Sequence, residues 1–354
     1  MPSKHMKSGS NSAPEMVESQ QPVEMLPATA SRIGGEEPSF ESKKKRSTSQ
    51  ILSTVLIVVG VALLLVAGGM WGFAQFQYWK QGETNTKLQN VAIVNDPTAE
   101  PKPYPDIDWE ALKAINPDVC GWIFVPDTVI SYPVYQGVDN DQYLRTNAMG
   151  EYSVGGQVFL DYESTKPGLV DQQSIIYGHH MQDGSMFQPL ALLDDQEVFD
   201  KTDTIWYLTE SNVYELEPLM MYWTEPTDTN VRQFRFDSLE AFRKYLHELL
   251  EKAVTKRSDA YTIITGAKHV LTMSTCNYYD GYGRSILVTI PKDEATKALD
   301  GTTMAEEAAA AEAKKQQEAA QQQNPEEGSE GSEQSEENTE GQEEWSEEGE
   351  QSWE

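Results

Sequence analysis

Three hydrophobic patterns follow one another along the chain, and each predicts a different kind of structure. From Ile51 to Phe73, about 23 residues pass without a charged side chain, and a helix needs only about 20 such residues to cross the hydrocarbon core of a bilayer. Between residues 106 and 295, short apolar runs alternate with turn residues, a pattern typical of β-rich domains. From residue 296 onward the chain is rich in Ala, Glu and Gln and then low in complexity. The pattern therefore predicts a membrane helix, one folded domain and a polar tail.

The charges around the apolar run predict its orientation in the membrane. Residues 43–46 are all basic and stand directly before the run, whereas only Lys80 lies close behind it. Because basic flanks stay on the cytoplasmic side, we expect a cytoplasmic N-terminus and an extracellular location for everything after residue 75. A cleaved signal peptide is the alternative, but the run is longer than a signal-peptide core and its basic cluster begins far from the N-terminus. We therefore predict a single-pass transmembrane helix at 49–75, in contact with membrane lipid.

Short runs rich in β-branched and aromatic residues make up most of the region 106–295. These runs span residues 121–126, 129–135, 155–162, 174–179, 204–209, 213–223, 261–266, 268–276 and 284–290. Their composition and spacing favour an all-β barrel or sandwich. Two helices are also expected. One is a short amphipathic helix at 106–115, and the other spans 237–253, where Leu239, Phe242, Leu246 and Leu249 lie on one stripe.

The remaining segments are too polar to form a core. Residues 1–48 and 296–354 cannot bury enough apolar surface to offset chain entropy. We expect a disordered cytoplasmic tail at 1–48 and an Ala/Glu/Gln-rich, then acidic, low-complexity tail at 296–354. Residues 76–105 are polar and carry four prolines near their end, so we expect an extracellular stalk. One folded domain at 106–295 remains, which is a usual domain size.

The charge of the chain excludes one class of partner. The formal net charge is −30 and the sequence pI is about 4.4. Residues 326–354 hold thirteen Glu and no Lys or Arg. Such a chain repels phosphates at long range, and no basic stripe in the central region compensates, so we expect no nucleic-acid partner. We interpret the acidic end as a solvated spacer, with interaction with Ca²⁺ or a cationic wall as the alternative.

Two cysteines are present, and their surroundings differ. In an exported chain they could form one disulfide. Cys120 lies between the first predicted helix and a predicted strand, where a small apolar side chain packs well, so we predict a buried, inert thiol. Cys276 ends an apolar strand and is followed by a loop rich in Tyr and Gly. A thiol at such a position is accessible, which makes Cys276 the candidate nucleophile.

A histidine pair and one arginine are the candidate partners of this thiol. His179 and His180 follow the apolar strand 174–178, and an imidazole beside a thiol can lower its pKa and later protonate a leaving amine. Arg284 starts the next strand, where a cation would stabilise a thiolate and the oxyanion of a tetrahedral intermediate. Spacing alone leaves open whether these strands adjoin. The alternative is ordinary strand-end histidines and a surface arginine paired with a carboxylate. Adjacent residues on a strand point to opposite faces, so the histidine pair does not suggest a metal site.

Together these residues resemble the sortases, and specifically class B. The segment 272–276, Thr-Met-Ser-Thr-Cys, is similar to the family's Thr-Leu-x-Thr-Cys signature with Met in place of Leu. The segment 177–187 is similar to the family's histidine segment, in which the histidine directly after Gly is catalytic; this selects His179. Arg284 falls where the family places its essential arginine, although the loop before it is short for the class. Segments between 121 and 162 also match in order, and the resemblance covers about residues 106–292.

The resemblance implies a mainly β fold, a sortase-type eight-stranded β-barrel with an N-terminal helix and an inserted helix. It implies a cysteine transpeptidase whose catalytic residues are His179, Cys276 and Arg284. No cofactor and no metal are expected. The implied substrate-binding residues are Asn140, Leu144, Ser274 and Thr275.

The activity implied by the resemblance joins secreted proteins to an amine outside the membrane. The enzyme would cleave a C-terminal sorting signal after Thr through a thioacyl intermediate. It would then transfer the protein to an amine of a Gram-positive cell wall. An alternative within the same chemistry is polymerisation of pilin subunits through a lysine amine. A non-catalytic membrane-tethered scaffold and a general cysteine peptidase are alternatives of other classes.

Overall fold

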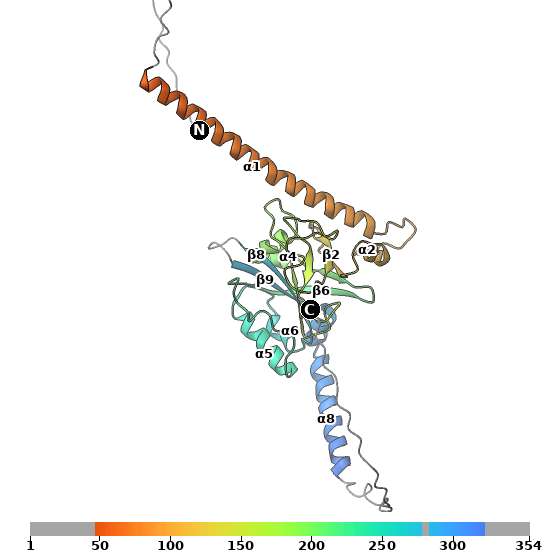
Figure 1. Ribbon diagram of the computed structural model, residues 1–354. Helices are drawn as coiled ribbons and strands as arrows, with labels where there is room; N and C mark the ends of the chain where they lie inside the picture. Colours follow the sequence, from red (N-terminus) through yellow and green to blue (C-terminus); the bar gives the residue numbers. More distant parts are fainter. Residues whose placement is uncertain (1–46, 278–282, 323–354) are drawn as a thin grey trace, which may run out of the picture. The chain divides into compact units, whose positions relative to one another are not determined.

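The computed structural model of the chain describes residues 47–277 and 283–322 (Figure 1). Side chains are described over the same ranges except at 276, 277 and 318–322. Residues 1–46 of the tail expected at 1–48, residues 323–354 of the tail expected at 296–354, and the loop 278–282 lie outside the described residues, whereas residues up to 322 of the second tail include helix. By their contacts, residues up to Leu63 form one unit and residues from Leu64 form a second. The sheet belongs to the second unit.

Helices precede, interrupt and follow the sheet. They are α1 (Thr48–Ala92), α2 (Trp109–Ile115), α3 (Gln188–Ala191), the 3₁₀ helix η1 (Leu192–Asp194), α4 (Gln196–Lys201), α5 (Leu239–Leu250), α6 (Ala260–Ile264), α7 (Lys292–Leu299) and α8 (Thr302–Gln322). The helix expected at 106–115 is α2, and the Asp108 carboxylate caps it by accepting a hydrogen bond from the Ala111 amide at 2.9 Å. The inserted helix is α5, which buries Phe242, Leu246 and Leu249 as predicted.

The described strands form one sheet, and eight of them close into a barrel. They are β1 (Val119–Phe124), β2 (Ser131–Tyr135), β3 (Val158–Leu160), β4 (Gln173–Tyr177), β5 (Ile205–Leu208), β6 (Val213–Thr224), β7 (Ala253–Lys256), β8 (Val270–Asn277) and β9 (Gly283–Pro291). Their order is β5-β1-β2-β3-β4-β8-β9-β6-β7, and β5 also pairs with β6. This pairing closes a ring of eight strands, because β6 then pairs with β9 and with β5, while β7 pairs only with the second half of β6. The predicted eight-stranded barrel is confirmed.

One predicted strand is wrong. Most of the run 261–266, predicted as a strand, lies in helix α6. Residues 253–256, which begin where the predicted helix ends, form strand β7 instead. In α6, Ile263 and Ile264 are fully buried in a cluster that also contains side chains of α5 and β9. A short apolar run fits a buried strand and a buried helical turn equally well, so periodicity cannot separate them.

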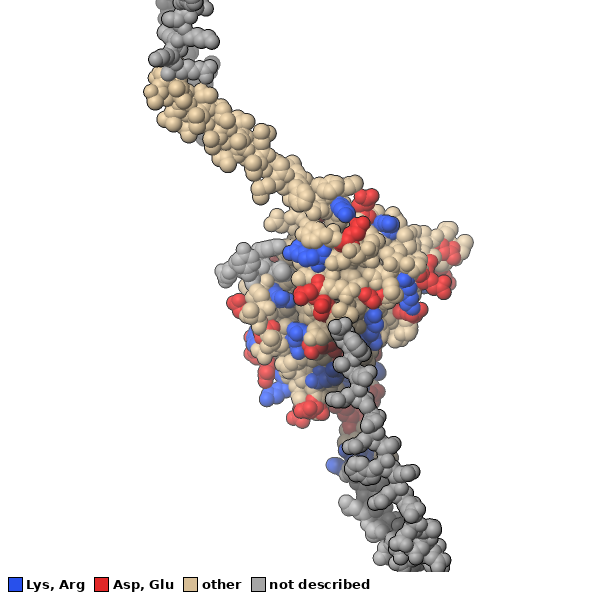
Figure 2. Space-filling model, in the orientation of Figure 1, with Lys and Arg blue, Asp and Glu red and all other residues tan. Residues whose placement is uncertain are grey.

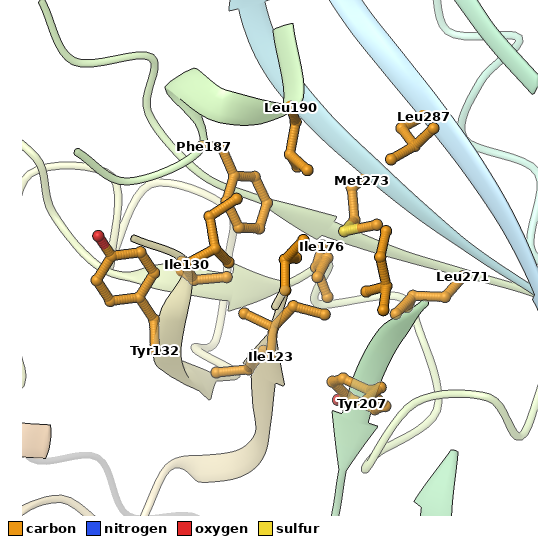
Figure 3. Close-up of a cluster of buried hydrophobic side chains, with 14 of the residues drawn as sticks. Ile123, Ile130, Tyr132, Ile176, Phe187, Leu190, Tyr207, Leu271, Met273 and Leu287 are labelled. Carbon is orange, nitrogen blue, oxygen red and sulfur yellow. The ribbon is translucent and has the colours of Figure 1, made fainter. Parts of the chain in front are cut away.

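Buried side chains fill both faces of the barrel wall. Inside the barrel, Ile123, Ile176, Met273 and Leu287 come from four different strands and point toward one another (Figure 3). The neighbours of Leu287 in β9 belong instead to a second cluster, which α5 and α6 cover from outside. Successive side chains of β9 point to opposite faces of the sheet, as in any strand. Because both faces are packed, the sheet is a rigid support for residues at the strand ends.

Helix α1 continues without a break from the apolar run into the folded domain. Its first part is almost entirely exposed and carries no charged side chain (Figure 2). Among the described residues, α1 is the one helix long and apolar enough to cross a membrane. Farther along, Gln81, Thr84, Asn85, Leu88 and Ala92 are buried. The segment 76–105, expected as a stalk, therefore begins as helix packed on the domain, because these residues recur at helical spacing on one face.

Candidate active site

The ends of three neighbouring strands bring the predicted catalytic positions together. In the parallel pair β4 and β8, Tyr177 lies opposite Ser274, and the Gly178 amide donates to the Ser274 carbonyl at 3.2 Å. His179 and Cys276 each follow two residues after this pair. In the antiparallel pair β8 and β9, Cys276 lies opposite Arg284. The backbone thus brings positions 179, 276 and 284 to one end of the sheet, while the side chain of Cys276 lies outside the described residues.

A close contact explains the glycine before the histidine. A Cβ atom on Gly178 would lie 2.5 Å from the Phe187 ring, and that ring is fully buried in the barrel core. The Phe187 amide also donates to the His179 carbonyl at 2.8 Å. Because only glycine allows the chain to pass this ring, the turn into His179 has a defined path.

The His179 ring is half-buried and held by one backbone carbonyl. Its Nε2 atom lies 2.7 Å from the Leu144 oxygen. Burial lowers the pKa of His179; the Leu144 bond opposes this shift and the charge of Arg145 adds to it. The neutral imidazole is therefore favoured. Since a carbonyl oxygen only accepts hydrogen bonds, Nε2 carries the proton in that form, and Nδ1 is left to exchange one.

Arg284 lies near the start of β9, opposite position 276. Its side chain is half-buried, and its guanidinium makes no ion pair or hydrogen bond with any group in the described part of the chain. Burial raises the pKa of Tyr177, as does the nearby charge of Asp161, whereas the charges of Arg232 and Arg284 oppose this shift. The Arg284 cation thus lies near the strand end that leads to His179 and keeps its donors available.

A buried carboxylate beneath these strand ends was missed by reasoning from the sequence. The Asp161 side chain is 0% exposed, and it accepts hydrogen bonds from Arg232 at 2.9 Å, from Tyr177 at 2.7 Å and from Asn140 at 2.9 Å. Burial opposes its ionisation, but these donors lower the pKa of Asp161 overall. Asp161 directly follows the apolar strand β3, a signal that could have identified it.

The four predicted substrate-binding residues differ in how exposed their side chains are. Leu144 is 38% exposed, and its carbonyl holds His179. The side-chain amide of Asn140 is hydrogen-bonded within the domain through both its nitrogen and its oxygen. The nitrogen donates to Asp161, and the oxygen accepts from the Tyr162 amide at 3.1 Å. Ser274 and Thr275 are each 3% exposed. Leu144 is thus the one of the four whose side chain is exposed, beside the histidine.

The other cysteine has the predicted inert character. Cys120 is a free, buried thiol, so the alternative of a disulfide between the two cysteines does not apply. Its Sγ donates to the Val134 carbonyl at 3.4 Å. Burial raises the pKa of Cys120 to about 12, and at neutral pH such a thiol has almost no reactive thiolate.

Comparisons with known proteins agree with this arrangement. Residues 123–291 match the family model described as Sortase domain. The chain is 31% identical over 240 residues to sortase B of Listeria monocytogenes, covering 65% of this chain and 94% of that protein. It is 30% identical over 177 residues to sortase B of Staphylococcus aureus, covering 50% of this chain and 70% of that protein.

A solved structure shows the same fold. Sortase B from Bacillus anthracis superposes with a TM-score of 0.51 at 29% identity, covering 61% of this chain and 99% of that one. The shared sequence spans nearly the full length of the Listeria protein and includes all three strand ends described above. The chain therefore belongs to the sortase family of transpeptidases, and its similarity is to class B.

Proposed function

We propose that the protein is a membrane-anchored sortase that cleaves a C-terminal sorting signal after Thr and transfers the cleaved protein to an amine of the cell wall. The observation that carries this proposal is the meeting of positions 179, 276 and 284 at the ends of β4, β8 and β9. A nucleophile, an acid/base group and a permanent cation within one site are what acyl transfer requires. The family-level similarity supports the same chemistry.

In the first half-reaction, the thiolate of Cys276 attacks the carbonyl carbon of the Thr residue in the signal. The carbonyl oxygen becomes an oxyanion, which the guanidinium of Arg284 stabilises. The carbon–nitrogen bond then breaks, and the departing amine takes a proton from the His179 imidazolium. The products are a thioester on Cys276 and the free C-terminal part of the signal.

In the second half-reaction, a neutral amine of the acceptor attacks the thioester carbonyl. His179 accepts the proton that the amine loses, Arg284 again stabilises the oxyanion, and the Cys276 thiolate leaves. A new amide joins the protein to the acceptor. The lowered pKa of His179 suits this step, because the neutral ring is the form that accepts a proton.

The proposed substrate groove lies beside His179. Leu144 would contribute an apolar side chain to the groove, because that side chain is exposed next to the ring. Asn140 would act on the groove indirectly, since its amide fixes the backbone at Tyr162 and the carboxylate of Asp161. Ser274 and Thr275 would shape the groove through the strand that carries them.

The proposed location is the cell membrane, with the N-terminus inside and the domain outside. The exposed apolar part of α1 supports a single membrane span, and the basic residues before it support this orientation. An enzyme anchored in this way meets exported proteins and wall amines on the same side of the membrane.

The decisive experiment traps the acyl-enzyme. The purified full chain is incubated with a library of sorting-signal peptides and a primary amine, and adducts are identified by mass spectrometry. We expect a thioester on Cys276 with one class of signal, and an amide product when the amine is present. An adduct that persists in Cys276→Ala, or hydrolysis without transfer to any added amine, would count against the proposal.

A further inference from the structure

Two polar side chains of α1 are buried in the domain, and the proposed chemistry does not use them. Gln81 and Asn85 are 3% and 7% exposed. They lie one helical turn apart, and Gln81 Nε2 donates to Asn85 Oδ1 at 3.1 Å. Burying an amide is costly unless it is hydrogen-bonded, so the partners of these two residues indicate their role.

Both residues hold the histidine loop, which we define as residues 178–187. Asn85 Nδ2 donates to the Met186 sulfur at 3.5 Å, and Gln81 Nε2 lies 3.9 Å from it. Met186 has a φ of 56°, a left-handed conformation that a non-glycine residue rarely adopts without support. It pairs with His180, and the next residue donates to the His179 carbonyl. The sulfur contacts therefore fix the far end of the loop that begins at His179.

Gln81 also holds the Leu144 loop, which we define as residues 143–157. Its Nε2 donates to the Gly156 carbonyl at 3.3 Å, and its Oε1 accepts a hydrogen bond from the Ser153 hydroxyl. The Ser153 amide in turn donates to the Arg145 carbonyl at 2.9 Å. Leu144, the residue before Arg145, supplies the carbonyl that binds the His179 ring. Gln81 therefore holds this hydrogen-bond acceptor in place together with the rest of the loop.

The backbone at Gly156 allows this contact. Gly156 has a φ of 53°, and a Cβ atom there would lie 2.2 Å from the Tyr143 carbonyl oxygen. The two ends of the Leu144 loop are thus in close contact at the point where Gln81 binds. A movement of Gln81 therefore moves the loop as well.

We propose that Gln81 and Asn85 are positioning residues that set the orientation of the His179 ring by holding the histidine loop and the Leu144 loop together. The proposal rests on the proposed function, in which His179 is the acid and base. It assigns α1 a second role, since the helix that carries the membrane span also forms part of the support of the active site.

The test replaces each amide by an apolar side chain of similar size in the full-length protein. We expect Asn85→Leu and Gln81→Met to lower kcat/KM for thioester formation by about 10-fold to 100-fold, as small misplacements of a catalytic group do. The pH profile of that rate should shift as well, because His179 then has a different environment. The matched control is Thr84→Val: Thr84 is buried on the same helix, and the described hydrogen bonds link its side chain to neither loop.

A double-variant cycle tests the route through the sulfur. If Asn85 acts through Met186, Asn85→Leu should have little further effect in a Met186→Leu background. Unchanged kinetics and an unchanged pH profile in both single variants would overturn the proposal, as would an equal loss in Thr84→Val. If Asn85→Leu does not fold, Asn85→Ser is measured in its place.

Controls at the catalytic residues separate this proposal from the proposed function. His179→Ala and Cys276→Ala should each abolish thioester formation. If they do not, the proposed function fails. If they do and the α1 variants remain fully active, only the positioning role fails.

Discussion

At the residue scale, the fully buried Asp161 carboxylate forms an ion pair with Arg232, whose side chain is 31% exposed, and links four segments of the barrel end. Two bonds from Arg232, at 2.9 and 3.1 Å, reach the Asp161 carboxylate, and the same carboxylate binds Tyr177 at the end of β4. A buried pair adds little stability over an apolar pair, but removal of one partner leaves an uncompensated charge. The pair therefore fixes the strand that leads to His179.

We predict that Arg232→Met destabilises the domain by about 3–5 kcal/mol, because the Asp161 charge remains buried without its cation. Urea unfolding of the full chain measures this loss. The double variant Asp161→Asn with Arg232→Met should recover part of it, since no charge is then buried. A single variant as stable as the parent protein would contradict the assignment.

The pH dependence of the parent protein follows from the same pair. The pKa of Asp161 is lowered in the folded state, so its stabilising contribution is present above the unfolded pKa of about 3.9 and is lost as pH falls through the folded value.

The two cysteines should differ in reactivity. The pKa of Cys120 is raised to about 12 by burial, so we expect iodoacetamide to leave it unmodified in the folded protein while it alkylates Cys276. Cys120→Ala should retain the full rate of thioester formation. Peptide mapping by mass spectrometry identifies the modified thiol, and equal labelling of both residues in folded protein would contradict this prediction.

At this scale the sequence supplies the candidate catalytic positions and misses the residues that support them. Cys276, His179 and Arg284 stand in recognisable motifs, and Cys120 has an apolar context that predicts its burial. Arg232 lies in a polar segment 71 residues from Asp161, and no local pattern links two residues so far apart. Their pairing depends on the closed barrel, so it appears only with the fold.

At the element scale, helices with an amphipathic pattern are predictable, whereas a short buried helix is not. The four strands before α3 follow from short apolar runs separated by turn residues, and α2 and α5 follow from their amphipathic patterns. The segment 253–266 departs from its prediction: β7 begins at Ala253, the last residue of the predicted helix, where no strand was expected, and most of the run expected as a strand forms α6. Tertiary packing decides here, because α6 buries Ile263 and Ile264 in the cluster shared with α5.

An ion pair joins α7 to the start of β8, the strand that carries Cys276. The Glu294 carboxylate lies 2.7 Å from His269 Nδ1 and accepts hydrogen bonds from the Lys268 and His269 amides. The hydrogen bond that His269 donates to the Glu294 carboxylate raises the pKa of His269; burial and the charge of Lys268 oppose this shift, and the charge of Asp293 adds to it. A raised pKa means that the stabilisation is fully present below the unfolded pKa and is lost as pH rises through the folded one.

We predict that Glu294→Gln destabilises the protein more at about pH 5.5 than at about pH 9, on either side of the ordinary histidine value of ~6.5. The pH-dependent part should not exceed about 1 kcal/mol, because the His269 side chain is 38% exposed and solvent screens the pair. Thermal unfolding at the two pH values measures it. In a His269→Gln background the difference between the pH values should disappear, and its persistence would assign the effect to another group.

At the scale of the whole molecule, the described chain has no long free spacer between its apolar helix and its barrel. The sequence predicts a stalk because the segment 76–105 is polar and ends in prolines. Polarity does not distinguish a solvated spacer from a helix whose amides are buried, and Gln81 and Asn85 are such amides. What the composition could not show is that these polar residues have hydrogen-bond partners on the barrel.

A pocket beside His179 is lined partly by residues of α1. This pocket of about 350 Å³ is lined on one side by Phe73, Ala74 and Gln77 of α1 and on the other by residues that include His179 and Gln182. Phe73 ends the apolar run, and Phe76 and Trp79 beyond it are exposed, with tilted rings whose centroids lie 5.8 Å apart, as expected for aromatic residues at a lipid headgroup layer. Gln182 and Phe73, the last residue of the apolar run, thus line the same pocket.

We predict that a fluorophore at position 182 is quenched by lipids that carry a nitroxide on the headgroup, whereas one at position 258 is not. Gln182 and Ser258 are both exposed; Gln182 lines a pocket with residues of α1, whereas Ser258, just before α6, lines a different pocket to which α1 contributes no residue. The labels are attached to Gln182→Cys and Ser258→Cys in a Cys276→Ala background, where the remaining thiol is the unreactive Cys120. An Ile57→Cys label, quenched by chain-labelled lipids, verifies that the helix is inserted. If that control is quenched and position 182 is not, the domain stands away from the bilayer, and its substrates need not be presented at the membrane surface.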